Sequence, residues 1–291
     1  MKLGLLGWPL SHSKSPKIHN LALSMANMEG SYDLVPVDSQ ENGKLAAEIQ
    51  KIRSGEITGF NVTIPYKEEA LRYMDRLSPA AKLIGAVNTI HQRDGLVIGD
   101  NTDAPGFVCD LKNQGLDLTQ KPGEAIVFGA GGSARAILYS LLSIGWQIHL
   151  LVRNVEKSRE MVNDIKGKGL TGGIKIRSVS ELRSTLKHTE IDLVVNTTPL
   201  GMFPNVEASP WAKEVGIPET TFVYDLIYNP GKTQLLLQAD QAGAKNANGQ
   251  GMLIEQALLS FEIWTGIKTN RDQFMKHFLQ MDQNLNQMEK K

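Results

Sequence analysis

The chain has 291 residues, and its 31 Lys and Arg residues balance 31 Asp and Glu residues, so its formal net charge is zero. This balance argues against nucleic acid or an anionic membrane as the main partner and favours a small molecule. The length suits two domains of ordinary size. The single cysteine, Cys109, cannot form an internal disulfide, so the composition predicts a reducing compartment, the cytoplasm.

Short β-rich runs alternate with amphipathic helical patterns in the first third of the chain. Strands are predicted at 2–7, 32–38 and 57–65, helices at 16–27, 41–55 and 66–77, and a hairpin at 86–100. The hairpin turns at Asp94-Gly95, a dipeptide suited to a tight two-residue loop. No apolar run approaches the roughly 20 residues that cross a bilayer.

The pattern restarts after Lys121. Residues 124–154 predict a strand, a glycine turn, a helix ending at Gly145 and a second strand, which together make one βαβ unit. Further strands are predicted within 192–202 and 221–230, and the segment from Met252 to residue 285 is predicted to be helical and to pack back on the first domain.

These elements predict a two-domain α/β protein. The first α/β domain spans 1–103 and is completed by C-terminal helices at about 252–291, and a Rossmann-like, doubly wound domain spans 104–251.

The sequence "GAGGSA" fits the pattern G-x-G-x-x-A directly after a predicted strand and at the start of a helix. In this setting Gly129 permits a tight turn, and Gly131 lets a pyrophosphate approach the backbone at the positive helix end. The alternative is an ordinary turn from strand to helix. The predicted cofactor-binding set in this turn is Gly129, Ala130, Gly131, Gly132, Ser133 and Ala134.

The end of the second strand, "LLVRNVEKSRE", distinguishes between dinucleotides. An NAD site usually places an acid there for the ribose hydroxyls. Arg153 stands there instead, followed by Asn154, and can pair with a 2′-phosphate, which favours NADP. Lys157 and Arg159 add positive charge or belong to a solvated helix face.

Lys67 stands in an unusual place in "NVTIPYKEEA". With Pro65 at the first helical position, Lys67 falls in the first turn, where the helix dipole disfavours a cation. Such a setting suits a lysine that transfers protons. The alternative is an exposed lysine screened by Glu68 and Glu69.

Polar residues follow several predicted strands, where ligands of α/β proteins gather. Asp103, after the second arm of the hairpin, is either a catalytic partner for Lys67 or the N-cap of the next helix. Asn61, Thr63 and Asn88 are candidate ligand contacts or simple turn residues.

The loop "SHSKSP" contains three serines, a histidine and a lysine before Pro16. Ser15 is predicted to be the N-cap of the following helix, with Pro16 at its first position. This leaves Ser13 without a local role, so the loop caps the helix, holds a ligand or does both, and His12 and Lys14 are assigned to the loop surface.

Eight segments occur in one order along nearly the whole chain: "SHSKSP", "NVTIPYK", "GAVNTI", "GDNTDAPG", "GAGGSARA", "NTTPLGM", "DLIYNP" and "NGQGMLIEQA". This set closely resembles the shikimate dehydrogenase family. The resemblance implies reversible NADP-dependent reduction of 3-dehydroshikimate to shikimate on the route to chorismate and the aromatic amino acids. It implies a first domain that binds substrate and a second that binds NADP.

The same resemblance implies roles for individual residues. Ser13 and Ser15 would hold the substrate carboxylate, and Lys67 and Asp103 would form the catalytic pair. Contacts to the ring hydroxyls or to the lysine would come from Asn61, Thr63, Asn88, Asp103, Tyr228 and Gln256. Thr198, Gly249 and Met252 would lie near the nicotinamide.

Two positions depart from the family pattern. The family often has Asn-Arg-Thr where this chain has Val152-Arg153-Asn154, and Gln250 takes a position that is commonly apolar.

Two rival functions stay open at this point. One is a quinate or quinate/shikimate dehydrogenase that uses NAD or NADP, and the other is a regulatory protein that binds a dinucleotide without catalysis. The presence of both Lys67 and Asp103 favours an enzyme. The sequence also leaves open whether the chain is a monomer or a homodimer.

Overall fold

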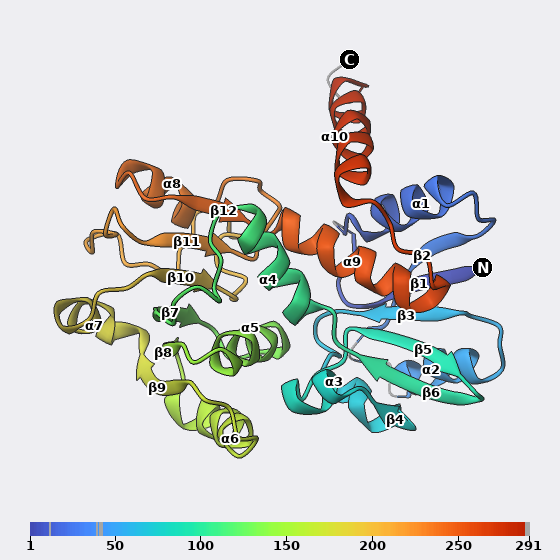
Figure 1. The fold of residues 1–291 in the computed structure, drawn as a ribbon, viewed down its shortest axis with the longest axis horizontal. Coiled ribbons are helices and arrows are strands. Elements are labelled where there is room, and N and C mark those ends of the chain that lie inside the picture. Colours follow the sequence, from blue (N-terminus) through green and yellow to red (C-terminus); the bar gives the residue numbers. More distant parts are fainter. Residues whose placement is uncertain (12, 39, 41–42, 289–291) are drawn as a thin grey trace. The chain divides into compact units, whose positions relative to one another are not determined.

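Two six-stranded sheets organise the computed structural model, which describes residues 1–11, 13–38, 40 and 43–288 (Figure 1). The chain forms two compact units. Unit 1 comprises Met1–Ser78, Val87–Thr102 and the segment from Gln256 onward, and unit 2 comprises Pro79–Ala86 and Asp103–Glu255.

Unit 1 is built on a mixed sheet with the strand order β2-β1-β3-β5-β6-β4. Strands β2, β1 and β3 are parallel, β5 runs antiparallel to β3 and β6, and β4 is parallel to β6. Its elements are β1 (Lys2–Gly7), α1 (Ser15–Met25), β2 (Ser31–Pro36), α2 (Lys44–Arg53), β3 (Gly59–Val62), the 3₁₀ helix η1 (Glu69–Tyr73), β4 (Arg76–Leu77), β5 (Thr89–Arg93), β6 (Leu96–Asp100) and α10 (Arg271–Met288), with α9 (Gln250–Thr265) entering it at Gln256.

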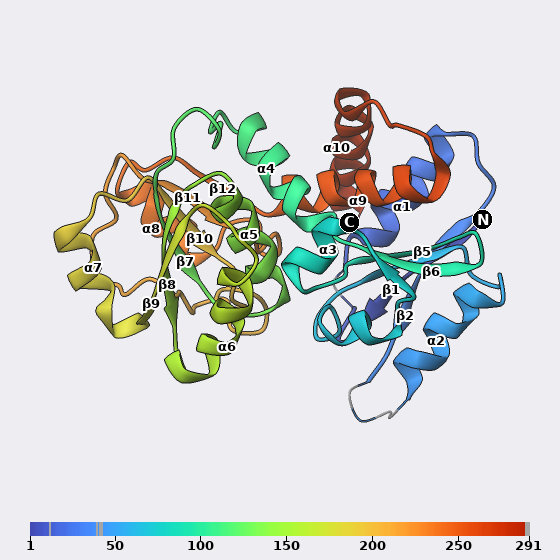
Figure 2. The same ribbon diagram turned by 60° about the horizontal axis from the view of Figure 1, so that its bottom comes forward.

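Helices cover both faces of the unit 1 sheet. Figure 2 shows α2 on one face and α1, α9 and α10 on the other. On the α1 face, Leu3, Leu5 and Tyr32 form a buried cluster against which Trp264 packs. The same face carries Asn61, because the register pairs Leu5 with Asn61 and Leu3 with Tyr32.

Unit 2 is built on a parallel sheet with the strand order β12-β11-β10-β7-β8-β9. Its elements are α3 (Pro79–Ile84), α4 (Asp103–Asn113), β7 (Glu124–Phe128), α5 (Gly132–Ser143), β8 (Gln147–Val152), α6 (Val155–Lys166), β9 (Gly173–Ser178), the 3₁₀ helix η2 (Val179–Glu181), α7 (Leu182–His188), β10 (Leu193–Asn196), β11 (Phe222–Asp225), α8 (Gln234–Gln241) and β12 (Asn246–Asn248).

The central strands of unit 2, namely β7, β10 and β11, are buried on both faces, as a sheet covered on both sides requires. Ala125 and Val127 of β7 belong to the core that α4, α5 and α6 cover. Ile126 and Phe128 belong to the core that α7 and α8 cover. The strand order reverses between β7 and β10, and ligands of doubly wound folds bind at such a switch point.

The predicted α/β architecture is confirmed, including the complete βαβ unit β7–α5–β8. The hairpin β5–β6 turns where expected, with positive φ angles at Asp94 (53°) and Gly95 (77°). The predicted helices at 16–27 and 41–55 correspond to α1 and α2, and Gly55 ends the second with φ +76°.

The predicted helix at 66–77 is wrong. Only the 3₁₀ helix Glu69–Tyr73 forms there, and β4 follows it. The backbone N–H of Asp75 bonds the Val97 carbonyl and that of Ser78 bonds the Gly99 carbonyl, both at 2.9 Å. Pairing with the exposed edge of β6 therefore outweighs a helical pattern of apolar residues.

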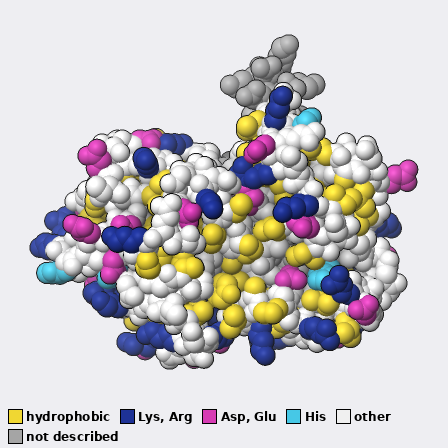
Figure 3. Space-filling model, viewed as in Figure 1, with side chains coloured by type: hydrophobic (Ala, Val, Ile, Leu, Met, Phe, Trp, Pro, Cys, Tyr) yellow, Lys and Arg dark blue, Asp and Glu magenta, His cyan; other side chains and the backbone are white. Residues whose placement is uncertain are grey.

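Charged residues are mixed over the surface. On the face drawn in Figure 3, basic and acidic side chains are interspersed, as the zero net charge suggests. Among the described residues, none of the helices combines the length and the apolar character that crossing a membrane requires.

His19 of α1 is fully buried in unit 1, stacked on Tyr32 with ring centroids 4.1 Å apart. Burial lowers the pKa of His19 from 6.5 to about 3, against an opposing contribution from the Asn61 side chain. At a pH between these two pKa values, His19 is protonated in the unfolded chain and neutral in the folded chain. Stability therefore falls as the pH drops below 6.5, by about 2 kcal/mol at pH 5 from this residue.

We predict that His19→Phe, which keeps a stacked ring, removes this component. Urea unfolding at pH 7 and pH 5 should give a smaller loss of unfolding free energy in the variant than in the wild type. His188→Gln, at an exposed position on α7, should keep the wild-type loss. An equal loss in His19→Phe and the wild type would contradict the prediction.

Candidate functional site

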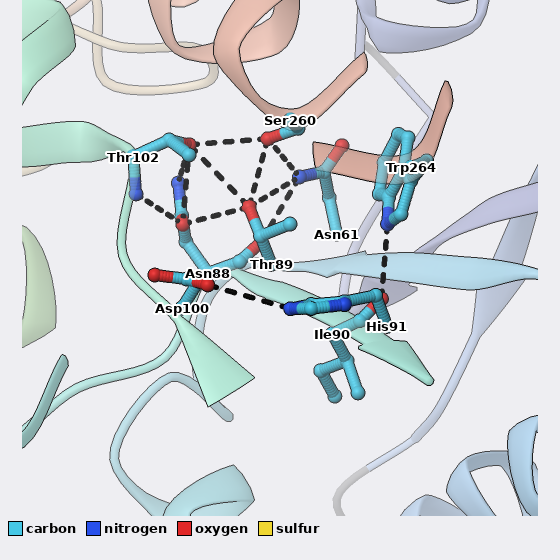
Figure 4. Close-up of polar contacts among 9 residues, drawn as sticks. All are labelled: Asn61, Asn88, Thr89, Ile90, His91, Asp100, Thr102, Ser260 and Trp264. Carbon is cyan, nitrogen blue, oxygen red and sulfur yellow. Dashed lines mark hydrogen bonds and ion pairs between the residues drawn. The ribbon is translucent and has the colours of Figure 1, made fainter. Parts of the chain in front are cut away.

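A buried network of amides and hydroxyls joins the end of β6 to α9 in unit 1 (Figure 4). Asn88 Oδ1 accepts the backbone N–H of Thr102 at 2.8 Å. Asn88 Nδ2 donates to Thr102 Oγ1 at 2.9 Å and to Gln256 Oε1 at 3.2 Å. The three side chains are 2–8 % exposed. This geometry brings together Asn88 and Gln256, which are 168 residues apart.

Asn61, on β3, extends the network. Its Nδ2 donates to the Asn88 carbonyl and to Ser260 Oγ, both at 3.0 Å, and lies 3.2 Å from Thr89 Oγ1. The hydroxyls of Thr89 and Ser260 are 2.7 Å apart. On the other side, Asn61 Oδ1 accepts from the Tyr32 hydroxyl at 2.8 Å. Both ends of this amide are therefore held by protein groups.

The sequence analysis missed four members of the network, namely Tyr32, Thr89, Thr102 and Ser260. A signal existed for Ser260, because it stands one helical turn after Gln256, on the same face of the predicted helix. At the edge of the network in Figure 4, His91 Nε2 lies 3.4 Å from Asp100 Oδ2.

The serine loop differs from its predicted geometry. Ser15 is the first residue of α1 and Lys14 is the N-cap, so Ser15 is not the N-cap and Pro16 is not the first helical residue. Ser13 Oγ instead accepts the Ser15 N–H at 3.2 Å. Ser15 is 5 % exposed and Ser13 is half-buried. The predicted surface residue His12 lies outside the described residues.

The helix-dipole argument for Lys67 is wrong, because no α-helix forms there and Pro65 does not begin one. Lys67 lies in a turn two residues before η1, and its side chain is half-buried. Its carbonyl accepts the Val87 N–H at 2.7 Å, one residue before Asn88. Thr63, also half-buried, follows β3, and its N–H bonds the Leu6 carbonyl at 2.8 Å.

Two candidate substrate contacts belong to unit 2. Asp103 is the first residue of α4 and only 4 % exposed, so it stands inside the helix and is not the N-cap. It directly follows Thr102 of the network in the chain. Tyr228 is half-buried in the loop after β11.

The glycine turn after β7 contains two glycines with different constraints. Gly129 has φ +104°, and a side chain there would collide with Thr197, so the protein itself requires glycine. Gly131, the N-cap of α5, has φ −99°, and a Cβ added there would meet nothing within 4 Å. Neither backbone conformation nor packing within the chain demands glycine at position 131. The remaining predicted residues of the turn are Ala130, Gly132, Ser133 and Ala134.

The residues after β8 are exposed. Arg153 and Lys157 are both exposed, and Asn154 caps α6 by accepting the Lys157 N–H at 2.9 Å. Arg159 pairs with Glu156 at 3.0 Å on the same helix, consistent with a solvated face. Arg153 directly follows the last residue of β8, so in the sequence it is the cation nearest to the end of that strand.

A buried carboxylate organises the loops after β10 and β11. Asp225 accepts from Asn196 Nδ2 at 3.0 Å, from the Ile227 N–H at 3.0 Å and from Thr233 Oγ1 at 2.6 Å. Asn196 Oδ1 in turn accepts from the N–H and hydroxyl of Thr198 at 2.9 and 2.7 Å. Hydrogen bonds to Asn196 within the same turn therefore fix the position of Thr198.

Gly249 and Met252 are both buried. A Cβ at Gly249 would collide with the Leu226 carbonyl, so this glycine allows the start of α9 to approach the β11 loop. Met252 is 7 % exposed and belongs to the unit 2 core. The polar Gln250 is the first residue of α9, and its N–H is capped by Asn248 Oδ1 at 3.0 Å.

Comparison with known proteins decides the family. The profile of the shikimate dehydrogenase substrate binding domain matches residues 5–90, and that of the shikimate 5′-dehydrogenase C-terminal domain matches residues 249–277. Shikimate dehydrogenase (NADP(+)) of Carboxydothermus hydrogenoformans is 38% identical over 265 residues, which cover 91% of each chain. The chain belongs to the shikimate dehydrogenase family.

Solved structures of shikimate dehydrogenases share the fold along nearly the whole chain. The Thermus thermophilus enzyme in complex with NADP(H) and shikimate has a TM-score of 0.82 and 32% identity, covering 96% of this chain and 99% of its own. The Listeria monocytogenes enzyme in complex with shikimate and NAD has a TM-score of 0.84 and 30% identity, covering 94% and 95%.

The matched regions of the shikimate dehydrogenase family include most candidate residues of unit 1. Residues 5–90 contain Ser13, Asn61, Lys67 and Asn88, and residues 249–277 contain Gln256. Within the part of the chain that the structure describes, no group of three or more His, Cys, Asp or Glu side chains could hold a metal ion.

Burial raises the pKa of Asp225 from 3.8 to about 6, although its three hydrogen bonds oppose the rise. At a pH between these two pKa values, Asp225 is protonated in the folded chain and ionised in the unfolded chain. Stability therefore falls as the pH rises through this window, by at most about 3 kcal/mol.

We predict that Asp225→Asn, which keeps the shape of the side chain, abolishes this fall. Urea unfolding between pH 4 and pH 7 should show that the unfolding free energy of the variant, relative to that of the wild type, rises with pH by at most about 3 kcal/mol. Asp240→Asn is the control, because Asp240 is an exposed carboxylate whose pKa is lowered by hydrogen bonds to Lys232 and Asn246. The prediction fails if the difference in unfolding free energy between Asp225→Asn and the wild type stays constant over this range.

Proposed function

We propose that this protein catalyses the reversible NADP-dependent reduction of 3-dehydroshikimate to shikimate in aromatic amino acid biosynthesis, in the cytoplasm. The observation that carries the proposal is the buried network around Asn61, Asn88 and Gln256. Amides and hydroxyls gathered in one place suit a ligand ring that carries several hydroxyls. The family membership supports the same reaction.

We propose that unit 1 binds the substrate and unit 2 binds NADP. Gly131 supports the second assignment, because the open space at its Cα suits the backbone approach of a pyrophosphate to the start of α5. Arg153 would hold the 2′-phosphate, with Asn154 and Lys157 beside it. NADPH, when bound, supplies a hydride to the ring carbonyl.

In this proposal, side chains of the protein bind the substrate and transfer the proton. Ser13 and Ser15, at the start of α1, would hold the substrate carboxylate through hydroxyl donors and the positive helix end. Lys67 would donate a proton to the oxygen as the carbonyl is reduced and take it back in the oxidation direction. Asp103 would orient the ring hydroxyl and the lysine.

The remaining candidates have supporting roles in this proposal. Thr63, Tyr228 and Gln256 would contact ring hydroxyls, and Thr198, Gly249 and Met252 would lie beside the nicotinamide. Gly249 and Met252 are buried, so in this proposal they would form walls for an apolar ring face and leave polar contacts to other groups.

Four assays test the overall proposal. Shikimate and quinate are each assayed with NADP and with NAD. Nicotinamide absorbance should change fastest with shikimate and NADP, and more slowly when quinate replaces shikimate or NAD replaces NADP. NAD is included because the Listeria monocytogenes relative was crystallised with it. An absence of turnover with shikimate and NADP would overturn the proposal.

We predict that Lys67→Ala lowers kcat by about 10²- to 10⁴-fold, because proton transfer to the developing alkoxide is lost. The KM for shikimate should stay within about threefold of the wild-type value. Lys82→Ala, at an exposed lysine of α3, should leave both constants unchanged. A near-normal kcat in Lys67→Ala would refute the role of the lysine.

We predict that Arg153→Ala raises the KM for NADP by about tenfold or more, because a charge-assisted bond to the 2′-phosphate is lost. The KM for NAD should stay unchanged, because NAD lacks this phosphate. Arg159→Ala removes an equally exposed arginine that pairs with Glu156 and is the matched control. Equal effects on NADP and NAD would contradict the assignment.

A further inference from the structure

Tyr32 of β2 lies beneath the candidate substrate site and takes no part in the mechanism above. Its ring is 1 % exposed, and its hydroxyl donates to Asn61 Oδ1 at 2.8 Å. Burial raises the pKa of Tyr32 well above its usual value, and the Ser15 side chain lowers it by a smaller amount. The phenol is therefore neutral and able to donate at neutral pH.

The side chains of α1 hold Tyr32 in place. His19 stacks on its ring with an interplanar angle of 9°. The neighbouring Asn20 accepts the Tyr32 N–H at 2.9 Å and donates to the Tyr32 carbonyl at 3.3 Å. The two consecutive residues "HN" thus fix both the ring and the backbone of one tyrosine.

Trp264 of α9 packs against both rings, with its centroid 5.3 Å from that of His19. Its ring is 6.3 Å from that of Tyr32, and its Nε1 donates to the Ile90 carbonyl at 3.0 Å. A side chain at Gly59 would collide with the Trp264 indole, so glycine at this point of β3 makes room for it. Gly59 stands two residues before Asn61 on the same face of the strand.

The Tyr32 hydroxyl determines how the Asn61 amide is oriented. With Oδ1 on the phenol, Nδ2 must face Ser260 and the Asn88 carbonyl, which are acceptors. Without the phenol, Oδ1 would lose its donor in a buried setting, and the amide could rotate.

We propose that Tyr32 is a positioning residue for substrate binding, which fixes the orientation of the Asn61 amide. This inference rests on the proposed function. Tyr32 itself touches no reacting atom, so its effect should reach the substrate through Asn61.

Tyr32→Phe keeps the ring that packs against His19 and Trp264 and removes only the hydroxyl. The KM for shikimate should rise about tenfold, consistent with the loss of one buried hydrogen bond. The kcat should stay within about threefold and the KM for NADP should not change. A Kd for shikimate from calorimetry should rise by the same factor as the KM.

Tyr66→Phe is the matched control. Tyr66 is also a buried tyrosine of unit 1, and its hydroxyl donates to the Val37 carbonyl at 3.0 Å, a backbone group outside the network. It should lose comparable thermal stability and keep the wild-type KM for shikimate. A merely structural loss would therefore move both variants alike.

A double-mutant cycle with Asn61→Ala separates positioning from an independent effect. In the Asn61→Ala background, adding Tyr32→Phe should change the KM for shikimate by less than about twofold, because the group through which Tyr32 acts is gone. The same tenfold factor in both backgrounds, or a wild-type KM in Tyr32→Phe, would overturn the inference alone. A wild type that does not turn over shikimate would overturn the proposed function first.

Discussion

Buried amides and hydroxyls must find hydrogen-bond partners, and this requirement shapes unit 1 around its candidate site. Asn88 can satisfy its amide because Thr102 comes from the end of β6 and Gln256 from α9. Asn61 needs Ser260 on one side and Tyr32 on the other. Five parts of the chain, at β2, β3, β5, β6 and α9, therefore have to be in place at once, which makes the site a consequence of the assembled unit.

The same requirement operates in unit 2 at the switch point of the sheet. The carboxylate of Asp225 holds Asn196 and Thr233, and Asn196 holds the turn at Thr198. Burial of this carboxylate without a cation raises its pKa, so the arrangement costs stability at neutral pH. His19 in unit 1 shows the opposite dependence on pH, because a buried imidazole resists protonation.

Local sequence patterns predicted the elements that depend on short-range chemistry. The turn at Asp94-Gly95, the glycine that ends α2 and the βαβ unit around Gly129 all follow from backbone preferences and hydrophobic period. The helix predicted at 66–77 is wrong although its apolar residues have a helical spacing. The local sequence does not show that Asp75 and Ser78 pair with β6. The caps of α1 and α4 were each misplaced by one residue, which is the usual uncertainty of a helix end.

The sequence by itself determined the alternation of strands and helices, the glycine turn, the arginine at the end of β8 and the family, because motifs record these features within a few neighbouring residues. Only the tertiary structure decided which side chains complete the site. Tyr32, Thr89, Thr102 and Ser260 look like ordinary strand, loop and helix residues until β2, β3, β5 and α9 are brought together. Their importance comes from the burial of polar atoms, and burial is a property of the folded chain.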